Sequence, residues 1–101
     1  MSEQENDHLT DRVVPKLPRG VRLKEDKARG VWTLLAPERT LQLDPIGVAI
    51  LNEVDGMRDL GAIVALLAER YNAPAEVIAR DVRAFLRDLG DRRMLDLVDT
   101  A

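Results

Sequence analysis

The sequence holds few side chains that act as nucleophiles, general bases or metal ligands. It contains no cysteine and a single histidine, His8, which lies in a polar N-terminal stretch. Catalysis needs such groups brought together in a poised arrangement. Neither GxGxxG nor the longer GxxxxGK pattern of a phosphate-binding loop occurs. We therefore expect no catalytic residue, no metal site, no bound cofactor and no enzymatic activity.

Two carboxylates on one predicted helix are the remaining candidates for acid–base chemistry. Asp81 and Asp88 are seven residues apart, so they share one flank of a helix. The nearby Arg80, Arg83 and Arg87 are simple ion-pair partners for them. We interpret this surface as a solvated charged face.

The composition is that of a small folded domain. A chain of 101 residues has room for one hydrophobic core. Its apolar residues, 46% of the total, include one Trp, one Tyr and one Phe, so aliphatic side chains must build that core. No apolar run is long enough to span a membrane, and the N-terminus lacks the hydrophobic centre of a secretion signal. The expected location is cytoplasmic, without membrane association.

The segment from residue 21 to residue 43 has the pattern of three short strands. They are predicted at 21–24, 31–35 and 39–43, separated by two polar turns. In the third strand, Leu41 and Leu43 alternate with Thr40 and Gln42, which predicts one buried and one exposed face. The segment is therefore expected to form an antiparallel meander.

Three helices are predicted after the meander, because the apolar period changes from two to about 3.6. Asp44 and Asp59 are predicted N-caps, Pro45 is a favourable first helical residue, and Gly90 is placed to end the third helix near residue 89. The predicted buried faces are Ile46, Ile50 and Val54 in the first helix; Leu60, Ile63, Val64, Leu67 and Tyr71 in the second; and Ile78, Val82, Phe85 and Leu89 in the third.

The order of these elements defines the expected fold class. It is α+β and winged helix-turn-helix-like, with a three-stranded antiparallel meander followed by three α-helices. Residues 1–16 are predicted to form a mobile N-terminal tail, and residues 17–101 to form the domain. The short apolar segment 94–98 is expected to pack back on the core.

The third strand closes the meander and should leave one of its edges unpaired. Edge strands are normally guarded by a lysine, a proline or a bulge. The residues from Thr40 to Leu43 include none of these guards. An open edge accepts an extended peptide as an added strand. The residues alone leave two alternatives open, in which the N-terminal segment or a second copy of the chain covers this edge.

A winged helix also suggests DNA binding, which the charges oppose. The chain has a net charge of −3. Residues 75–93 carry five basic and four acidic side chains, and the acidic ones would lie against phosphates. We therefore expect no nucleic-acid partner. A DNA-binding regulator is still an alternative function, as is a self-associating structural protein that forms a homodimer through the open edge.

Five short motifs occur together in an order and spacing typical of one protein family. They are Pro37-Glu38-Arg39, Leu43-Asp44, Asp55-Gly56, Asp81-Val82 and Phe85-Leu86. Over residues 17–95 the sequence resembles the PqqD family of pyrroloquinoline quinone biosynthesis proteins. That family is similar in fold to the elements that recognise the leader segments of ribosomally made and modified peptides (RiPPs).

The resemblance implies a function and a binding site. A member of this family is expected to be a peptide chaperone that binds the precursor peptide PqqA and presents it to PqqE. PqqE is a radical S-adenosylmethionine (SAM) enzyme that links a glutamate and a tyrosine side chain of the precursor. The leader is expected to add to the third strand, in a groove between this strand and the third helix. Carried over to this sequence, the peptide-binding residues are Arg39, Thr40, Leu41, Gln42 and Leu43 of the strand and Ile78, Asp81, Val82, Phe85 and Leu86 of the helix.

Overall fold

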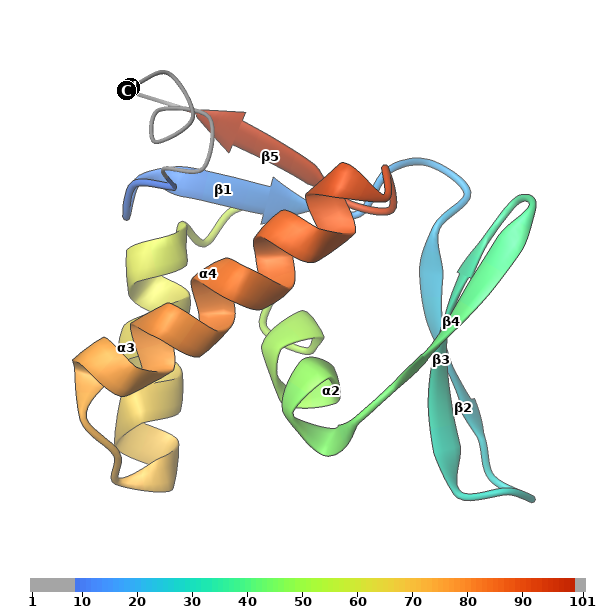
Figure 1. Cartoon of the computed structure of the whole chain (residues 1–101), viewed down its shortest axis with the longest axis horizontal. Coiled ribbons are helices and arrows are strands. Elements are labelled where there is room, and N and C mark those ends of the chain that lie inside the picture. The colour runs from blue at the N-terminus through green and yellow to red at the C-terminus, as the bar shows by residue number, and fades with distance from the viewer. Residues whose placement is uncertain (1–8, 100–101) are drawn as a thin grey trace.

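Two antiparallel sheets and three helices make up the fold of residues 9–99, which the computed structural model describes. The strands are β1 (Val13–Lys16), β2 (Arg22–Asp26), β3 (Val31–Ala36), β4 (Arg39–Leu43) and β5 (Asp96–Asp99), and the helices are α2 (Pro45–Leu51), α3 (Leu60–Tyr71) and α4 (Ala75–Asp91). Strands β2, β3 and β4 form a meander, and β1 pairs with β5 in a separate sheet. The helices lie beside the meander and beneath the β1–β5 pair in Figure 1. The predicted meander followed by three helices is confirmed.

One face of the meander belongs to the hydrophobic core. Leu34 is fully buried and pairs in register with Leu41, and Trp32 pairs with Leu43 on the same face. Thr40 and Gln42 alternate with these residues and are exposed. The half-buried character predicted for the third strand is confirmed, because the alternation in sequence matches the two faces of the sheet.

Side-chain caps begin the first two helices as predicted. An Asp44 carboxylate oxygen accepts a hydrogen bond from the Gly47 N–H at 2.7 Å, and Asp59 accepts one from the Ala62 N–H at 2.8 Å. The loop between these helices is ordered by Asp55, which accepts hydrogen bonds from the backbone N–H groups of Arg58 and Met57. These two hydrogen bonds, that of Arg58 first, hold the pKa of the Asp55 carboxyl below its usual value.

Aliphatic side chains from every helix meet the meander in one core. Its least exposed members come from α2, α3, α4, β3 and the segment after α4, namely Ile50, Leu60, Ile63, Val82, Leu86, Leu89, Leu34 and Met94. Burying side chains of this size stabilises the fold by about 1.5–3 kcal/mol each before entropy costs. The predicted packing of the segment after α4 is confirmed, because Met94 and Leu95 are buried.

The predicted N-terminal tail extends too far along the chain. Residues 13–16 were placed in it, yet they form β1, and Val13 and Pro15 are buried. β1 pairs with β5, from Val13 opposite Asp99 to Lys16 opposite Asp96. A strand of four residues whose partner lies at the other end of the chain leaves no periodic signal in its own sequence. The part of the predicted tail before Leu9 lies outside the described residues.

The predicted helix ends and faces need three further corrections. The first helix ends at Leu51, so Val54 lies beyond it. Ile46 and Tyr71 were predicted to be buried, but they are 60% and 56% exposed because no element of the described part of the chain covers the first turn of α2 and the last turn of α3. Gly90 lies within α4, where a Cβ atom would come within 3.0 Å of Leu97, and the helix continues to Asp91.

A buried carboxylate ties the end of α2 to α3. Glu53 is 8% exposed, and its two carboxylate oxygens accept hydrogen bonds from Arg58 at 3.1 Å and from Arg70 at 2.8 Å. Both arginine side chains are partly exposed, so water screens part of each interaction. The network still matters because a buried carboxylate needs partners to balance its desolvation.

The Glu53→Ala substitution is expected to lower the free energy of unfolding by about 2 kcal/mol, because two charged hydrogen bonds are lost. Denaturation by urea, followed by circular dichroism, measures the change. Glu69→Ala is the matched control, because Glu69 is exposed on α3, and it should change the value by less than about 0.5 kcal/mol. Similar losses in the two variants would contradict a stabilising role for the Glu53 network.

Candidate functional site

Within residues 9–99, strand β4 is paired with β3 along one edge and unpaired along the other. β3 and β4 are joined by the two-residue turn of Pro37 and Glu38, so Ala36 and Arg39 form the closing pair. In a hairpin with a two-residue loop the closing pair exchanges hydrogen bonds, and the pattern then alternates. The N–H and C=O groups of Thr40 and Gln42 therefore point away from β3, toward the unpaired edge.

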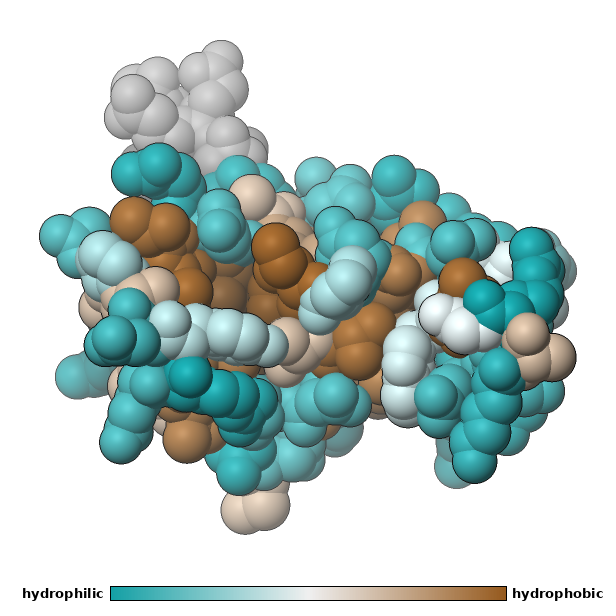
Figure 2. All heavy atoms as spheres, turned by 90° about the horizontal axis from the view of Figure 1, so that it is seen from below, coloured by the Kyte–Doolittle hydropathy of each residue, from teal (hydrophilic) through white to brown (hydrophobic). Residues whose placement is uncertain are grey.

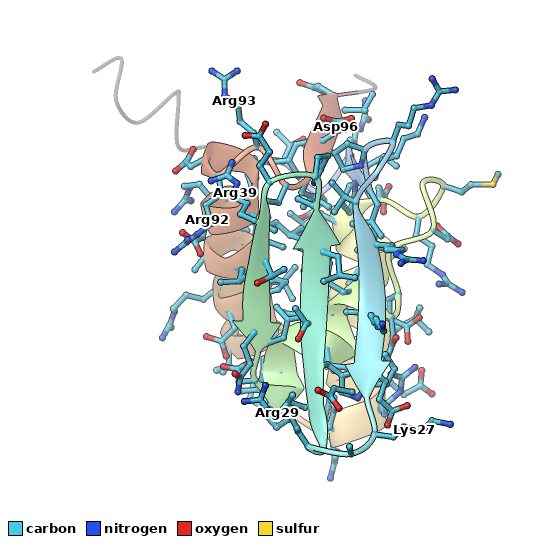
Figure 3. The ribbon with its side chains drawn as sticks, turned by 90° about the vertical axis from the view of Figure 1, so that its right-hand side faces the viewer. Lys27, Arg29, Arg39, Arg92, Arg93 and Asp96 are labelled. Carbon is cyan, nitrogen blue, oxygen red and sulfur yellow. The ribbon has the colours of Figure 1, made fainter. Side chains whose placement is uncertain are left out.

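The Arg39 side chain joins the start of β4 to the end of α4. The Arg39 Nη2 donates a hydrogen bond to the carbonyl oxygen of Arg92, just after the end of α4. The first residue of the strand is thus next to the end of the helix. Figure 3 shows β4 at the side of the sheet that faces α4, with Arg39 and Arg92 close together.

An apolar hollow of about 260 Å³ opens where β4 gives way to α2. It is lined by the beginnings of α2 and α4 and the end of α3, through Pro45, Ile46, Ala49, Ile50, Leu67, Tyr71, Ile78, Asp81 and Val82. Figure 2 shows apolar side chains gathered over the middle of this face of the molecule. The hollow begins two residues beyond Leu43, so the unpaired edge and the hollow are consecutive along the chain.

The predicted site residues separate into surface and core. On β4, Arg39, Thr40 and Gln42 are exposed, whereas Leu43 is 9% exposed. Leu41 is partly buried against the core. On α4, the predicted residues differ in the same way: Ile78, Asp81 and Val82 line the hollow, Phe85 is partly buried, and Leu86 has no exposed surface. Leu86 therefore supports the surface from behind.

Sequence reasoning missed the contribution of α2 and α3 to this surface. The hollow includes Pro45, Ile46 and Ala49 from α2 and Leu67 and Tyr71 from α3, and no residue of β4. Ile46 and Tyr71 had been assigned to buried helix faces, because their helical spacing is the same as that of core residues. The hollow thus lies to the α2 and α3 side of the predicted groove between strand and third helix, and that groove is still a prediction.

This arrangement offers hydrogen bonds and apolar contact to a ligand. The hollow has one charged lining residue, Asp81, which has no ion-pair partner within residues 9–99. In the same part of the chain no three His, Asp or Glu side chains lie close enough to hold a metal ion. Of the helices described, none is both long enough and apolar enough to cross a membrane. The site therefore offers outward-pointing backbone groups on β4 and an apolar surface beside them.

The family model described as coenzyme PQQ synthesis protein D (PqqD) matches residues 32–95, which include all of β3 but its first residue, β4, and the helices α2, α3 and α4. This chain belongs to the PqqD family. The resemblance found in the sequence is thereby confirmed, and the match covers both the unpaired edge of β4 and the hollow.

Relatives and solved structures agree with this membership. The chain is 54% identical over 85 residues to a protein of Rhizobium meliloti (strain 1021) named PqqA binding protein, covering 84% of this chain and 87% of the relative. The solution structure of the PqqD part of Methylobacterium extorquens PqqCD has a TM-score of 0.79 and 40% identity, covering 91% of this chain and 98% of that one. The crystal structure of PqqD from Xanthomonas campestris has a TM-score of 0.57 and 38% identity, covering 89% and 100%.

A glycine sets how closely α2 and α4 approach each other beneath this site. A Cβ atom added at Gly47 would lie 2.9 Å and 3.1 Å from two carbons of the Phe85 ring. Distances this short require the ring to move. Gly47 is itself buried in the first turn of α2. The pair therefore fixes how α4 packs against α2 beside the hollow.

Gly47→Ala is expected to lower the free energy of unfolding by about 1–3 kcal/mol, because the new methyl group displaces the Phe85 ring. The usual helix preference for alanine over glycine, up to about 1 kcal/mol, acts in the opposite direction. Urea denaturation of Gly47→Ala, Phe85→Leu and the double variant measures the coupling. The double variant should lose less stability than the two single losses combined. Strict additivity would show that the ring and the glycine do not pack against each other.

Proposed function

We propose that this chain is a peptide chaperone of pyrroloquinoline quinone (PQQ) biosynthesis, which binds the precursor peptide PqqA and presents it to the radical SAM enzyme PqqE. In this proposal PqqA pairs as an added strand with the unpaired edge of β4, and its apolar side chains enter the hollow. The chain supplies binding and PqqE supplies the radical chemistry. The observation that carries the proposal is the outward-pointing backbone of Thr40 and Gln42 next to an apolar hollow.

The named relatives support a peptide as the ligand. The Rhizobium meliloti relative is named PqqA binding protein, and the Methylobacterium extorquens structure is described as a functional and stand-alone RiPP recognition element. Strand addition supplies register through the backbone and selectivity through side-chain pockets. Both features are available here, because the outward-pointing groups of β4 and the hollow that begins at α2 are consecutive along the chain.

The size of the site suits a carrier that must release its cargo. Four backbone hydrogen bonds contribute about 1 kcal/mol each, and each buried apolar side chain contributes about 2 kcal/mol. Ordering the peptide and bringing two molecules together offset a large part of this gain. We therefore expect a dissociation constant near the micromolar range.

The unpaired edge also accommodates a second copy of the chain. Two β4 strands can pair across a two-fold axis, which would give a homodimer through the same backbone groups. Such a dimer and a bound peptide compete for one edge. Static light scattering with and without PqqA distinguishes them, because the peptide should convert any dimer into a one-to-one complex.

Gln42→Pro is expected to weaken PqqA binding at least tenfold, because proline removes an outward-pointing N–H and obstructs strand pairing. The fold should survive, because this N–H does not bond to β3. Isothermal titration with synthetic PqqA measures binding, and circular dichroism checks folding. Gln42→Ala is the matched control, since it keeps the backbone donor and should bind normally. A folded Gln42→Pro variant with normal affinity would overturn strand addition in this register.

Hydrogen exchange tests the same register without a substitution. In the free protein, the amides of Leu41 and Leu43 should exchange slowly, because they bond to β3, and those of Thr40 and Gln42 should exchange fast. PqqA should protect Thr40 and Gln42 selectively. Protection spread equally over all four amides would instead indicate general stabilisation of the sheet.

Ile46→Ser is expected to weaken PqqA binding about tenfold and to leave stability almost unchanged, because this rim side chain is 60% exposed in the free protein. The measurements are isothermal titration and thermal unfolding. Met57→Ser is the matched control: Met57 is 83% exposed and lies outside the hollow, so its removal should affect neither quantity. If the two variants bind equally well, the hollow does not receive the peptide.

A further inference from the structure

Three arginines lie at the end of the candidate site away from the hollow. Arg39 begins β4, and Arg92 and Arg93 follow α4 directly. Figure 3 shows all three at the same end of the sheet, opposite the hairpin that carries Lys27 and Arg29. The site therefore runs from a cationic end at the start of β4 to the apolar hollow beyond its end.

Two of these positive charges have no carboxylate partner among the residues that the structure describes. Arg92 pairs with Asp88 at 3.1 Å. Arg39 donates to a neutral backbone carbonyl, and neither Arg39 nor Arg93 forms an ion pair with any carboxylate within residues 9–99. A guanidinium bound only to a neutral carbonyl keeps other N–H donors available for a planar carboxylate.

Arg93 also has a backbone conformation that favours glycine. Its φ angle is 61°, and the following N–H, that of Met94, donates to the Leu89 carbonyl at 3.0 Å. This is the helix-ending arrangement in which glycine is preferred, because other residues are strained in the left-handed region. An arginine here lowers stability and places a cation beside Arg39, and such unfavourable backbone conformations cluster at functional sites.

We infer that carboxylate side chains of the bound peptide contact Arg39 and Arg93 and thereby fix its position along β4. This inference rests on the proposed function. It adds that the site recognises the order of acidic and apolar side chains along the peptide. From Arg39 to Pro45, where the hollow begins, an extended chain covers about 20 Å at 3.3 Å per residue. The preferred peptide therefore has an acidic residue about six positions from its apolar anchor.

The test compares three substitutions by isothermal titration with synthetic PqqA at low salt. Arg93→Gln and Arg39→Gln should each weaken binding about fivefold, and Arg29→Gln, which removes the same charge at the far end of the sheet, should not. The loss of affinity caused by Arg93→Gln should shrink to less than about twofold in 0.5 M salt, because screening weakens exposed charge pairs. A version of PqqA with its acidic residues replaced by amides should bind equally to the wild type and to Arg93→Gln.

Arg93→Gly separates binding from folding. Glycine relieves the left-handed backbone, so this variant should melt about 4 °C above the wild type while binding about fivefold more weakly. If the wild type binds PqqA and the Arg39 and Arg93 variants bind it with normal affinity, this inference is overturned and the proposed function stays intact. Failure of the wild type to bind PqqA at all would overturn both.

Discussion

The turn between β3 and β4 contains two residues, and this length decides what the unpaired edge presents. Because Ala36 and Arg39 close the hairpin, the backbone groups of Arg39, Leu41 and Leu43 are used within the sheet. Those of Thr40 and Gln42 are left for a partner. A turn one residue longer would shift the alternation and turn Leu41 and Leu43 out of the core. The length of the turn therefore determines both the burial of the leucines and the exposure of the backbone groups.

The helices keep this strand in place and add the second half of the surface. Asp44 caps α2 immediately after Leu43, so the chain passes from strand to helix with no flexible linker. Gly47 then lets the Phe85 ring lie against α2, which sets the spacing of α2 and α4. The hollow exists because these contacts hold the two helices together while the first turn of α2 stays uncovered.

Local patterns were enough to predict the meander, both helix caps and the open strand. Leu41 and Leu43 identify the inner face, and Asp44 with Pro45 marks the start of α2, because each signal involves neighbouring residues. The β1–β5 pair depends on residues at least 80 positions apart, such as Lys16 and Asp96, and has no local signal. The exposure of Ile46 could not be predicted either, because helical spacing gives the direction of a side chain and not what covers it. The family resemblance supplied the ligand, and the individual contact residues are still predictions.

Several features that lower the stability of this domain lie along the surface formed by β4, the hollow and the end of α4. The unpaired edge of β4 exposes backbone groups, Ile46 and Tyr71 expose apolar area, and Arg93 occupies a backbone conformation that glycine would adopt at lower cost. Stabilising choices are available at each of these positions, including a lysine on the strand, polar residues on the helices and a glycine after α4. When several unfavourable local features lie on one surface, a binding function explains all of them together, whereas packing would need a separate explanation for each. The opposite edge of the meander, where Lys24 lies on β2, has a guarding residue of the usual kind and provides the comparison within the same sheet.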